Sequence, residues 1–518
     1  MKSIKWKKLL THILSAFVFL GCAACSTGES NQSEVLTPSE IAAIEDKIPD
    51  YSGNDNQFTY FAYQGVTDGK WTEYGTVYYC GEDFRTVERM KEFKEAGLHI
   101  MYMPASVGIS VNDPNAPFDY ESSSIKVILD NAAIAGVKVI VFDLRLWTVD
   151  GVVGEGRTYA NEAELDAQIE KMMGSYASHP AFYGVSLNDE PYYTKLPSIG
   201  GVYRSIKRVF PESFILANLT PPVGVALTND KFPQATEETM VKYGNSVYAE
   251  RYARFETYLN MFLDETGCDY ICYDLYPMAS DNLSGYYLGG MQVAANVAKE
   301  RGVKFHFVTQ SSTMTPSQRF LTEEDCRWLN NMSLGFGVST VGYWTYYTRT
   351  ESSGSEYYED GAAFVTHFGE KTDLYYWMQQ IHKENQAFAP TILSFKYSNC
   401  ATFKVENCTD GAGNALSCFT DISALAKVKN VTINKESALV TELYDAENDR
   451  YMYMLQNLVD PLFTGSQVYQ TATIEFNTNY AYAVVFRNGE RTVVRLHKNS
   501  YTVKQNPGEA VFILPFNA

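Results

Sequence analysis

The sequence predicts an α/β protein: a (β/α)8 TIM barrel followed by a C-terminal all-β sandwich domain. With 518 residues, the chain is too long for one compact domain and long enough for two with sizeable cores. From about residue 57 to 390, short apolar runs alternate with amphipathic helical stretches, as in a repeated β–α unit. After Pro390 only short alternating segments remain, separated by Asn, Gly and Asp turns, and these are typical of antiparallel sheets.

Eight apolar runs are the expected strands of the barrel, and a helix or loop follows each of them. No glycine-rich phosphate loop follows any of the runs, which disfavours a doubly wound nucleotide-binding sheet. The expected strands are Phe58–Tyr63, Ile100–Met103, Val137–Leu144, Phe182–Leu187, Phe214–Ala217, Tyr270–Asp274, Phe305–Val308 and Val341–Thr345. The clearest expected helices are Arg85–Ala96, Asn161–Tyr176, Tyr252–Glu265, Glu323–Asn331 and Asp373–Phe388, the last ending before Pro390.

The expected sandwich strands are Tyr451–Gln456, Thr471–Phe476, Ala481–Arg487, Thr492–His497 and Ala510–Leu514. We therefore divide the chain into residues 1–25, 26–56, 57–390 and 391–518: a leader, a tether with a lead-in, the barrel and the sandwich.

The first 25 residues combine a lysine-rich head, an apolar stretch and small residues, which is the pattern of a secretory signal. A cysteine directly after small residues resembles a bacterial lipobox, and either Cys22 or Cys25 fits that place. This resemblance implies a lipid-anchored protein of the bacterial cell envelope, held to the membrane by its N-terminal lipid. Ordinary signal cleavage is the alternative.

The charge balance is acidic, with 42 Lys and Arg against 61 Asp and Glu, a formal net charge of −19. Such a chain repels polyanions, so we expect no nucleic-acid partner. The cysteines show neither a disulfide framework nor zinc-finger spacing, and we expect no metal and no cofactor. Cys400, Cys408 and Cys418 lie close enough in sequence for one bridge in an oxidising compartment.

Function in a barrel of this kind belongs to the C-terminal ends of its strands. Those ends are polar or aromatic almost throughout, and such side chains hydrogen-bond vicinal hydroxyls and stack on sugar rings. A carbohydrate is therefore the expected ligand. The candidate substrate-binding residues are Tyr63, Asp143, Arg145, Trp147, Asn188, Asn218, Tyr276, Gln310, Trp344 and Tyr346.

The most specific motif is Asn188-Asp189-Glu190-Pro191, at the tip of the fourth expected strand and shortly after His179-Pro180. It resembles the fourth-strand region of the large barrel clan of retaining glycoside hydrolases, with a pattern similar to family 42. The resemblance implies hydrolysis of O-glycosidic bonds, with Glu190 as the general acid/base. A carboxylate at a helix N-terminus is the structural alternative for Glu190, and a helix cap for Asp189.

The chain departs from that clan at the seventh strand, where Gln310 occupies the place of the nucleophilic glutamate. An amide cannot attack an anomeric carbon, so three hypotheses remain. In the first, Asp274 or Asp143 supplies the second carboxylate, at the spacing of a retaining enzyme or at the wider spacing of an inverting one. In the second, Asp189 orients a substrate N-acetyl group that attacks in its place. In the third, the site binds glycans without cleaving them. Asp143 and Arg145 have a structural alternative as an ion pair, and Trp147 and Trp344 as lids over the core. The catalytic candidates are thus Glu190, Asp189 and Asp274.

Overall fold

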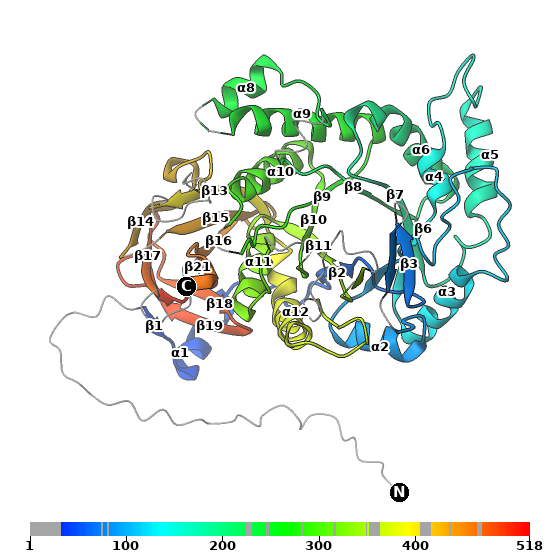
Figure 1. Cartoon of the computed structure of the whole chain (residues 1–518). Helices are drawn as coiled ribbons and strands as arrows, with labels where there is room; N and C mark the ends of the chain where they lie inside the picture. The colour runs from blue at the N-terminus through cyan, green and yellow to red at the C-terminus, as the bar shows by residue number, and fades with distance from the viewer. Residues whose placement is uncertain are drawn as a thin grey trace, which may run out of the picture.

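The computed structural model describes residues 33–73, 76–79, 82–223, 230–244, 246, 248–280, 283–313, 318–348, 350–351, 363–404, 416–434, 437–463 and 469–518. Within these residues the chain forms a parallel barrel with an antiparallel sandwich beside it (Figure 1). This architecture confirms the predicted fold class.

The barrel sheet has eight strands in the order β8-β7-β6-β5-β2-β11-β10-β9, all joined in parallel. One parallel bridge between Leu219 and Tyr273 links the two edge strands and closes the ring. Every run expected to be a barrel strand is one. The strands are β2 (Thr59–Ala62), β5 (Ile100–Tyr102), β6 (Lys138–Phe142), β7 (Phe182–Asp189), β8 (Phe214–Asn218), β9 (Tyr270–Asp274), β10 (Lys304–Gln310) and β11 (Val338–Trp344).

Helices surround the barrel and separate its strands in sequence (Figure 1). They are α2 (Val87–Glu95), α3 (Ser124–Ala135), α4 (Leu144–Thr148), α5 (Glu162–Met173), α6 (Leu196–Val209), α8 (Glu237–Tyr243), α9 (Ala249–Thr266), α10 (Tyr287–Arg301), α11 (Glu323–Gly335) and α12 (Asp373–Ile392). None of the described helices is both long enough and apolar enough to cross a membrane. A small sheet of β3 (Lys70–Glu73), β4 (Thr76–Tyr79) and β12 (Thr350–Glu351) lies outside the ring order.

Several element boundaries differ by a few residues from the sequence prediction, and two of these differences have a clear local cause. The third strand ends at Phe142 rather than Leu144, because Asp143 caps α4 by accepting a hydrogen bond from the Arg145 backbone N–H at 3.1 Å. The last barrel helix does not end before Pro390 but continues to Ile392, with Pro390 in its final turn. There the missing proline N–H costs a single helical hydrogen bond, close to the end of the helix.

The sandwich pairs a seven-stranded sheet, β1-β19-β18-β21-β16-β15-β13, with a three-stranded sheet, β14-β17-β20. Part of the lead-in joins it, since β1 pairs with β19 and α1 (Pro38–Ala43) follows. The strands are β1 (Glu34–Val35), β13 (Lys396–Phe403), β14 (Val428–Ile433), β15 (Ala438–Asp445), β16 (Arg450–Asn457), β17 (Gln470–Phe476), β18 (Tyr482–Arg487), β19 (Glu490–Arg495), β20 (Ser500–Gln505) and β21 (Ala510–Phe516).

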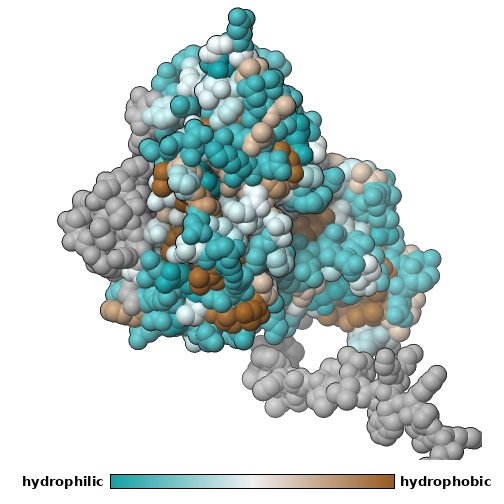
Figure 2. All heavy atoms as spheres, turned by 90° about the vertical axis from the view of Figure 1, so that its right-hand side faces the viewer, coloured by the Kyte–Doolittle hydropathy of each residue, from teal (hydrophilic) through white to brown (hydrophobic). Residues whose placement is uncertain are grey.

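The large sheet is buried on both faces. In β16, Met452 and Met454 belong to the core that also fills the barrel, whereas Tyr453 and Leu455 belong to a second core inside the sandwich. Alternate residues of a strand point to opposite faces, so one face of this sheet packs on the barrel and the other on the small sheet. The outer face of the barrel in Figure 2 is mostly hydrophilic, with small separate hydrophobic patches.

Two thiols approach each other in the sandwich. The Sγ atoms of Cys400 and Cys418 are 3.4 Å apart, and both cysteines are free thiols. The hydrogen bond to Cys400, together with burial, raises the pKa of the Cys418 thiol well above its usual value. Cys408, the third cysteine of this group, lies outside the described residues.

We expect a disulfide reagent such as oxidised glutathione to link Cys400 to Cys418, each thiol giving up one hydrogen. Because the two cysteines are 18 positions apart, the closed loop raises the free energy of unfolding by about 3 kcal/mol. Thermal unfolding with and without reductant, beside the Cys400→Ser variant as control, measures this. A wild-type melting temperature that reductant does not change would contradict it.

Candidate functional site

Three polar side chains stand at the ends of three neighbouring barrel strands. Asp189 is the last residue of β7, Asn218 the last of β8 and Asp274 the last of β9. Since the strands are parallel, these ends share one face of the barrel, the face where barrel proteins place their chemistry. All three residues are among those predicted from the sequence.

Asn218 bridges the two aspartates. Its buried side-chain N–H2 donates to Asp189 Oδ1 at 2.9 Å and to Asp274 Oδ1 at 2.7 Å. The two N–H bonds of an amide diverge at about 120°, so the accepting oxygens are about 5 Å apart. Asn218 Oδ1 is buried and has no hydrogen-bond partner among the described residues.

The environment of Asp274 favours its protonated form. Burial raises the pKa of its carboxyl group, and the charges of Glu190 and Asp189 raise it further. Hydrogen bonds from Asn218 and Tyr276 act in the opposite direction but do not cancel these effects, so the pKa lies well above its ordinary value. Asp274 therefore keeps a proton at pH values where an exposed aspartate is ionised.

Glu190 lies beside this pair with an unusual backbone. Its φ is 45°, in the left-handed region that few non-glycine residues adopt, and its N–H donates to Asn218 O at 2.8 Å. Its Oε2 accepts a hydrogen bond from Lys231 Nζ at 2.8 Å, and the Lys231 carbonyl is itself held by the Tyr193 N–H at 2.9 Å. Glu190 thus has a positioned cationic partner.

Aromatic rings form an apolar wall near the carboxylates. Tyr63 follows β2 and its ring centroid lies 4.2 Å from that of Tyr102 and 5.2 Å from that of Trp344. Burial, and next the charge of Asp189, raises the pKa of Tyr63 well above its usual value, which places this ring close to the acidic group. Such a wall suits the apolar face of a sugar ring.

Asp143 and Arg145 pair with each other away from the other site residues. Arg145 Nη2 donates to Asp143 Oδ2 at 2.6 Å and to the Met172 carbonyl of α5 at 2.8 Å, and both side chains are buried. The Tyr176 hydroxyl also donates to Asp143 Oδ2, at 2.8 Å. Of the two aspartates considered as the second carboxylate, only Asp274 lies with Asp189.

Two other candidate substrate-binding residues, Gln310 and Tyr346, contact parts of the protein away from the carboxylates. The buried Gln310 amide pairs with the backbone of Met278, accepting from its N–H at 3.1 Å and donating to its carbonyl at 3.4 Å. Tyr346 is buried against Phe93 of α2 and Phe364. Neither side chain belongs to the cluster of carboxylates. The Gln310 amide, which was expected to bind a sugar, is hydrogen-bonded to the protein backbone instead.

A cleft of about 670 Å³ lies between α4, the end of β7 and the start of α6. Asn188, which directly precedes Asp189, lines it, as does Trp147 of α4. The indole N–H of Trp147 donates to the Ser186 carbonyl at 2.9 Å, which fixes the ring. The cleft volume is within the range typical of ligand sites.

Two residues of the site were missed from the sequence. Tyr102 is the last residue of β5, one position before the apolar end assigned there, and its hydroxyl donates to Ser186 Oγ at 3.1 Å. The alternation of strand side chains was the available signal for Tyr102. Lys231 lies in the long segment between β8 and α9, and no local pattern links it to Glu190.

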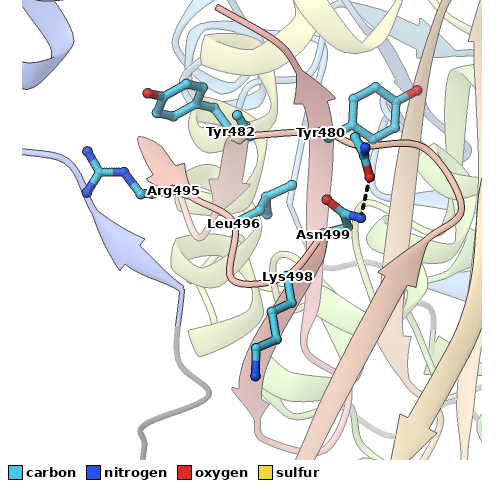
Figure 3. Close-up of a pocket in the computed structure, with 8 residues that line it drawn as sticks. Tyr480, Tyr482, Arg495, Leu496, Lys498 and Asn499 are labelled. Atoms are coloured by element: carbon cyan, nitrogen blue, oxygen red, sulfur yellow. Dashed lines mark hydrogen bonds between the residues drawn. The ribbon is translucent and has the colours of Figure 1, made fainter.

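A separate hollow of about 320 Å³ lies on the sandwich (Figure 3). Its eight lining residues include no carboxylate. Arg495 at its edge is paired with Glu34 and Glu40 at 3.1 and 3.0 Å. Acid–base chemistry therefore belongs to the barrel and not to this hollow.

Within the described ranges, no group of three or more His, Cys, Asp or Glu side chains is arranged to hold a metal ion. The lipidation candidates, Cys22 and Cys25, lie outside the described residues.

No family model and no curated protein matches this sequence. Among solved structures, the chain is similar to a glycoside hydrolase, with 9% identity, TM-score 0.45 and coverage of 94% of this chain and 98% of the other. A glycoside hydrolase family 5 protein from Bacteroides vulgatus has 10% identity, TM-score 0.48 and 89% coverage of both chains. An endo-beta-1,4-mannanase from Thermotoga petrophila has 11% identity, TM-score 0.40 and coverage of 88% and 99%. With TM-scores below 0.5, these likenesses identify neither the reaction nor the substrate of this chain.

Proposed function

We propose that this protein hydrolyses O-glycosidic bonds of an oligo- or polysaccharide. One arrangement carries the proposal: the Asn218 amide donates to Asp189 Oδ1 and to Asp274 Oδ1, which places these two oxygens about 5 Å apart, and burial with the nearby charges of Glu190 and Asp189 raises the pKa of Asp274. A carboxylic acid beside a carboxylate at this spacing is the equipment of a retaining glycosidase.

In this mechanism Asp274 donates its proton to the glycosidic oxygen as the bond to the anomeric carbon breaks. The Asp189 carboxylate attacks that carbon and forms a glycosyl ester. Water then attacks the ester, its proton passes to the Asp274 carboxylate, and the sugar leaves with Asp189 restored. Every proton that leaves Asp274 in the first step returns in the second.

This assignment places the proton donor at Asp274 and not at Glu190, where the sequence resemblance placed it. Glu190 forms an ion pair with Lys231, and a proton donor would have to break that pair. Of Asp274 and Glu190, only Asp274 is both buried and close to other negative charges. We assign Glu190 a supporting role, since its charge contributes to the raised pKa of Asp274. The alternative is that Glu190 is the general acid/base, and the variants Glu190→Gln and Asp274→Asn distinguish the two assignments.

The sugar in the cleaved position contacts the aromatic wall. Trp344, which is only partly buried and packs on the buried Tyr63, offers its ring to the sugar. We further propose that the enzyme works at the bacterial cell envelope, anchored through Cys22 or Cys25; the signal-like first 25 residues support this location.

Gln310 favours a second candidate function, glycan binding without cleavage. Its amide stands where the resembling clan has a nucleophile, and it is committed to the Met278 backbone. A binder of this kind keeps the aromatic wall and needs no reactive carboxylate.

The test is a panel of aryl glycosides and polysaccharides offered to the wild type and to Asp189→Asn. We expect the wild type to cleave at least one member and Asp189→Asn to be at least a hundredfold slower. Saturable binding of glycans without cleavage by either protein would instead establish the binder. Cleavage restricted to N-acetylhexosaminides would indicate that the N-acetyl group of the substrate, and not Asp189, attacks the anomeric carbon.

A further inference from the structure

We propose that the cleft beside Asn188 is a subsite for a sugar unit that carries a negative charge, such as a uronic acid or a sulfated sugar. This inference rests on the proposed function, since it names the substrate class of the same site. Charged side chains, one aromatic ring and the start of a helix line this cleft.

The cleft has two cations and one anion in a protein whose net charge is −19. Arg157 and Lys195 are exposed, and within the part of the chain that the structure describes no ion pair joins either of them to an acid. Asp150 is the cleft's anion, and it accepts a hydrogen bond from the Val152 N–H at 3.1 Å. Two positive groups therefore face the cleft without acidic partners, unlike Arg145 or Arg319 elsewhere in the protein.

The start of α6 adds to this positive field. Pro197 and Ser198 of its first turn line the cleft, and this turn contains no acidic residue. Lys195, at the N-cap, makes no side-chain capping bond. The positive end of the helix dipole therefore adds to the field of Arg157 and Lys195, and Asp150 is the one carboxylate among the residues that line the cleft.

The ring of Trp147 makes the cleft suitable for a sugar and not only for a small anion. Its indole N–H is held by the Ser186 carbonyl, and it is only partly buried. A pyranose stacked on this ring brings a carboxylate or sulfate within the reach of the long Arg157 and Lys195 side chains. Beyond the screening length of about 8 Å, the protein's overall negative charge has little effect on such a local contact.

The cleft reaches the strand that carries Asp189, because Leu187 and Asn188 of β7, directly before that residue, line it. An acidic unit bound there is one of the sugars next to the cleaved bond. The expected substrate is a polysaccharide in which acidic units occur beside the bond that is hydrolysed.

The experiment is calorimetric titration of Asp274→Asn, which avoids turnover, with oligosaccharides of equal length that are neutral, uronate-containing or sulfated. We expect at least tenfold tighter binding of one acidic class than of the neutral one, with the preference reduced at high salt. Arg157→Gln with Lys195→Gln is expected to remove the preference. Lys91→Gln with Lys383→Gln, on α2 and α12, makes the same charge change away from the cleft and is expected to keep it.

Equal binding of acidic and neutral oligosaccharides, or a preference that survives Arg157→Gln with Lys195→Gln, would overturn the inference. The two acidic classes separate a uronate from a sulfate as the bound group. The proposed function fails separately: a wild type that binds acidic sugars through these two cations but cleaves none refutes hydrolysis and leaves the subsite standing.

Discussion

Asp274→Asn is expected to lower kcat/KM by about a hundredfold to ten-thousandfold without lowering the stability of the protein at pH 7. The loss follows because asparagine cannot donate a proton to the leaving oxygen, and a positioned general acid contributes about 10² to 10⁴ in rate. Asparagine also keeps the size of the side chain. Its amide oxygen can still accept the 2.7 Å hydrogen bond from Asn218.

The stability of this variant has a predictable dependence on pH. The folded protein raises the pKa of Asp274, so the stability linked to this group is fully present below the ordinary aspartate pKa and is lost as pH rises through the raised value. Asparagine does not titrate. The melting temperature of Asp274→Asn relative to wild type should therefore increase as pH rises across that window.

Glu190→Gln is the matched control for this prediction. Removing its charge takes away one cause of the raised pKa of Asp274, so we expect activity to remain but its alkaline limit to move to lower pH. If Glu190→Gln abolishes hydrolysis and Asp274→Asn retains more than a tenth of it, Glu190 is the proton donor and our assignment is wrong.

Arg319→Met is expected to have the largest effect on stability, with a loss of about 3 to 5 kcal/mol in the free energy of unfolding. Arg319 is buried, and its Nη2 donates to Asp325 Oδ1 of α11 at 2.6 Å and to Asp460 Oδ1 at 2.5 Å. Asp460 follows β16 of the sandwich, so this guanidinium ties barrel to sandwich. Removing it leaves two buried carboxylates without their cation.

Urea unfolding of Arg319→Met and Arg301→Met measures this difference. Arg301 makes a 2.5 Å ion pair with Asp264, but the two side chains are 35% and 65% exposed, against 8% and 0% for Arg319 and Asp325, so its loss is expected to cost less than about 1 kcal/mol. A second change, Asp460→Asn, should recover part of the stability lost in Arg319→Met. Equal effects of the two arginine variants would contradict the role of burial.

The fold was predictable because its signals are local and repeated. Each barrel strand is a short apolar run, and each expected strand was found. Two of the boundaries that moved depend on single side chains: Asp143 ends β6 by capping α4, and Pro390 falls in the last turn of a helix, where it is tolerated. The helix and strand propensities of the residues alone do not determine where these two elements end.

The site was predictable only in part. Asp189, Asn218 and Asp274 could be placed together, because the ends of parallel strands meet on one face of a barrel. The ion pair of Arg145 with Asp143 was one of the alternatives drawn from the sequence and is present, whereas the partners of Gln310 and Tyr346 could not be predicted, because Met278 and Phe364 come from other segments of the chain. Lys231 was missed for the same reason, since its contact with Glu190 spans 41 positions.

The most direct test of the central claim is proton NMR of the first product that the wild type releases from any glycoside of the panel. Carboxylates about 5 Å apart predict that the product keeps the anomeric configuration of the substrate. A product of inverted configuration would contradict the assignment of Asp189 and Asp274 as the reacting pair, and the absence of any cleavage would contradict hydrolysis itself.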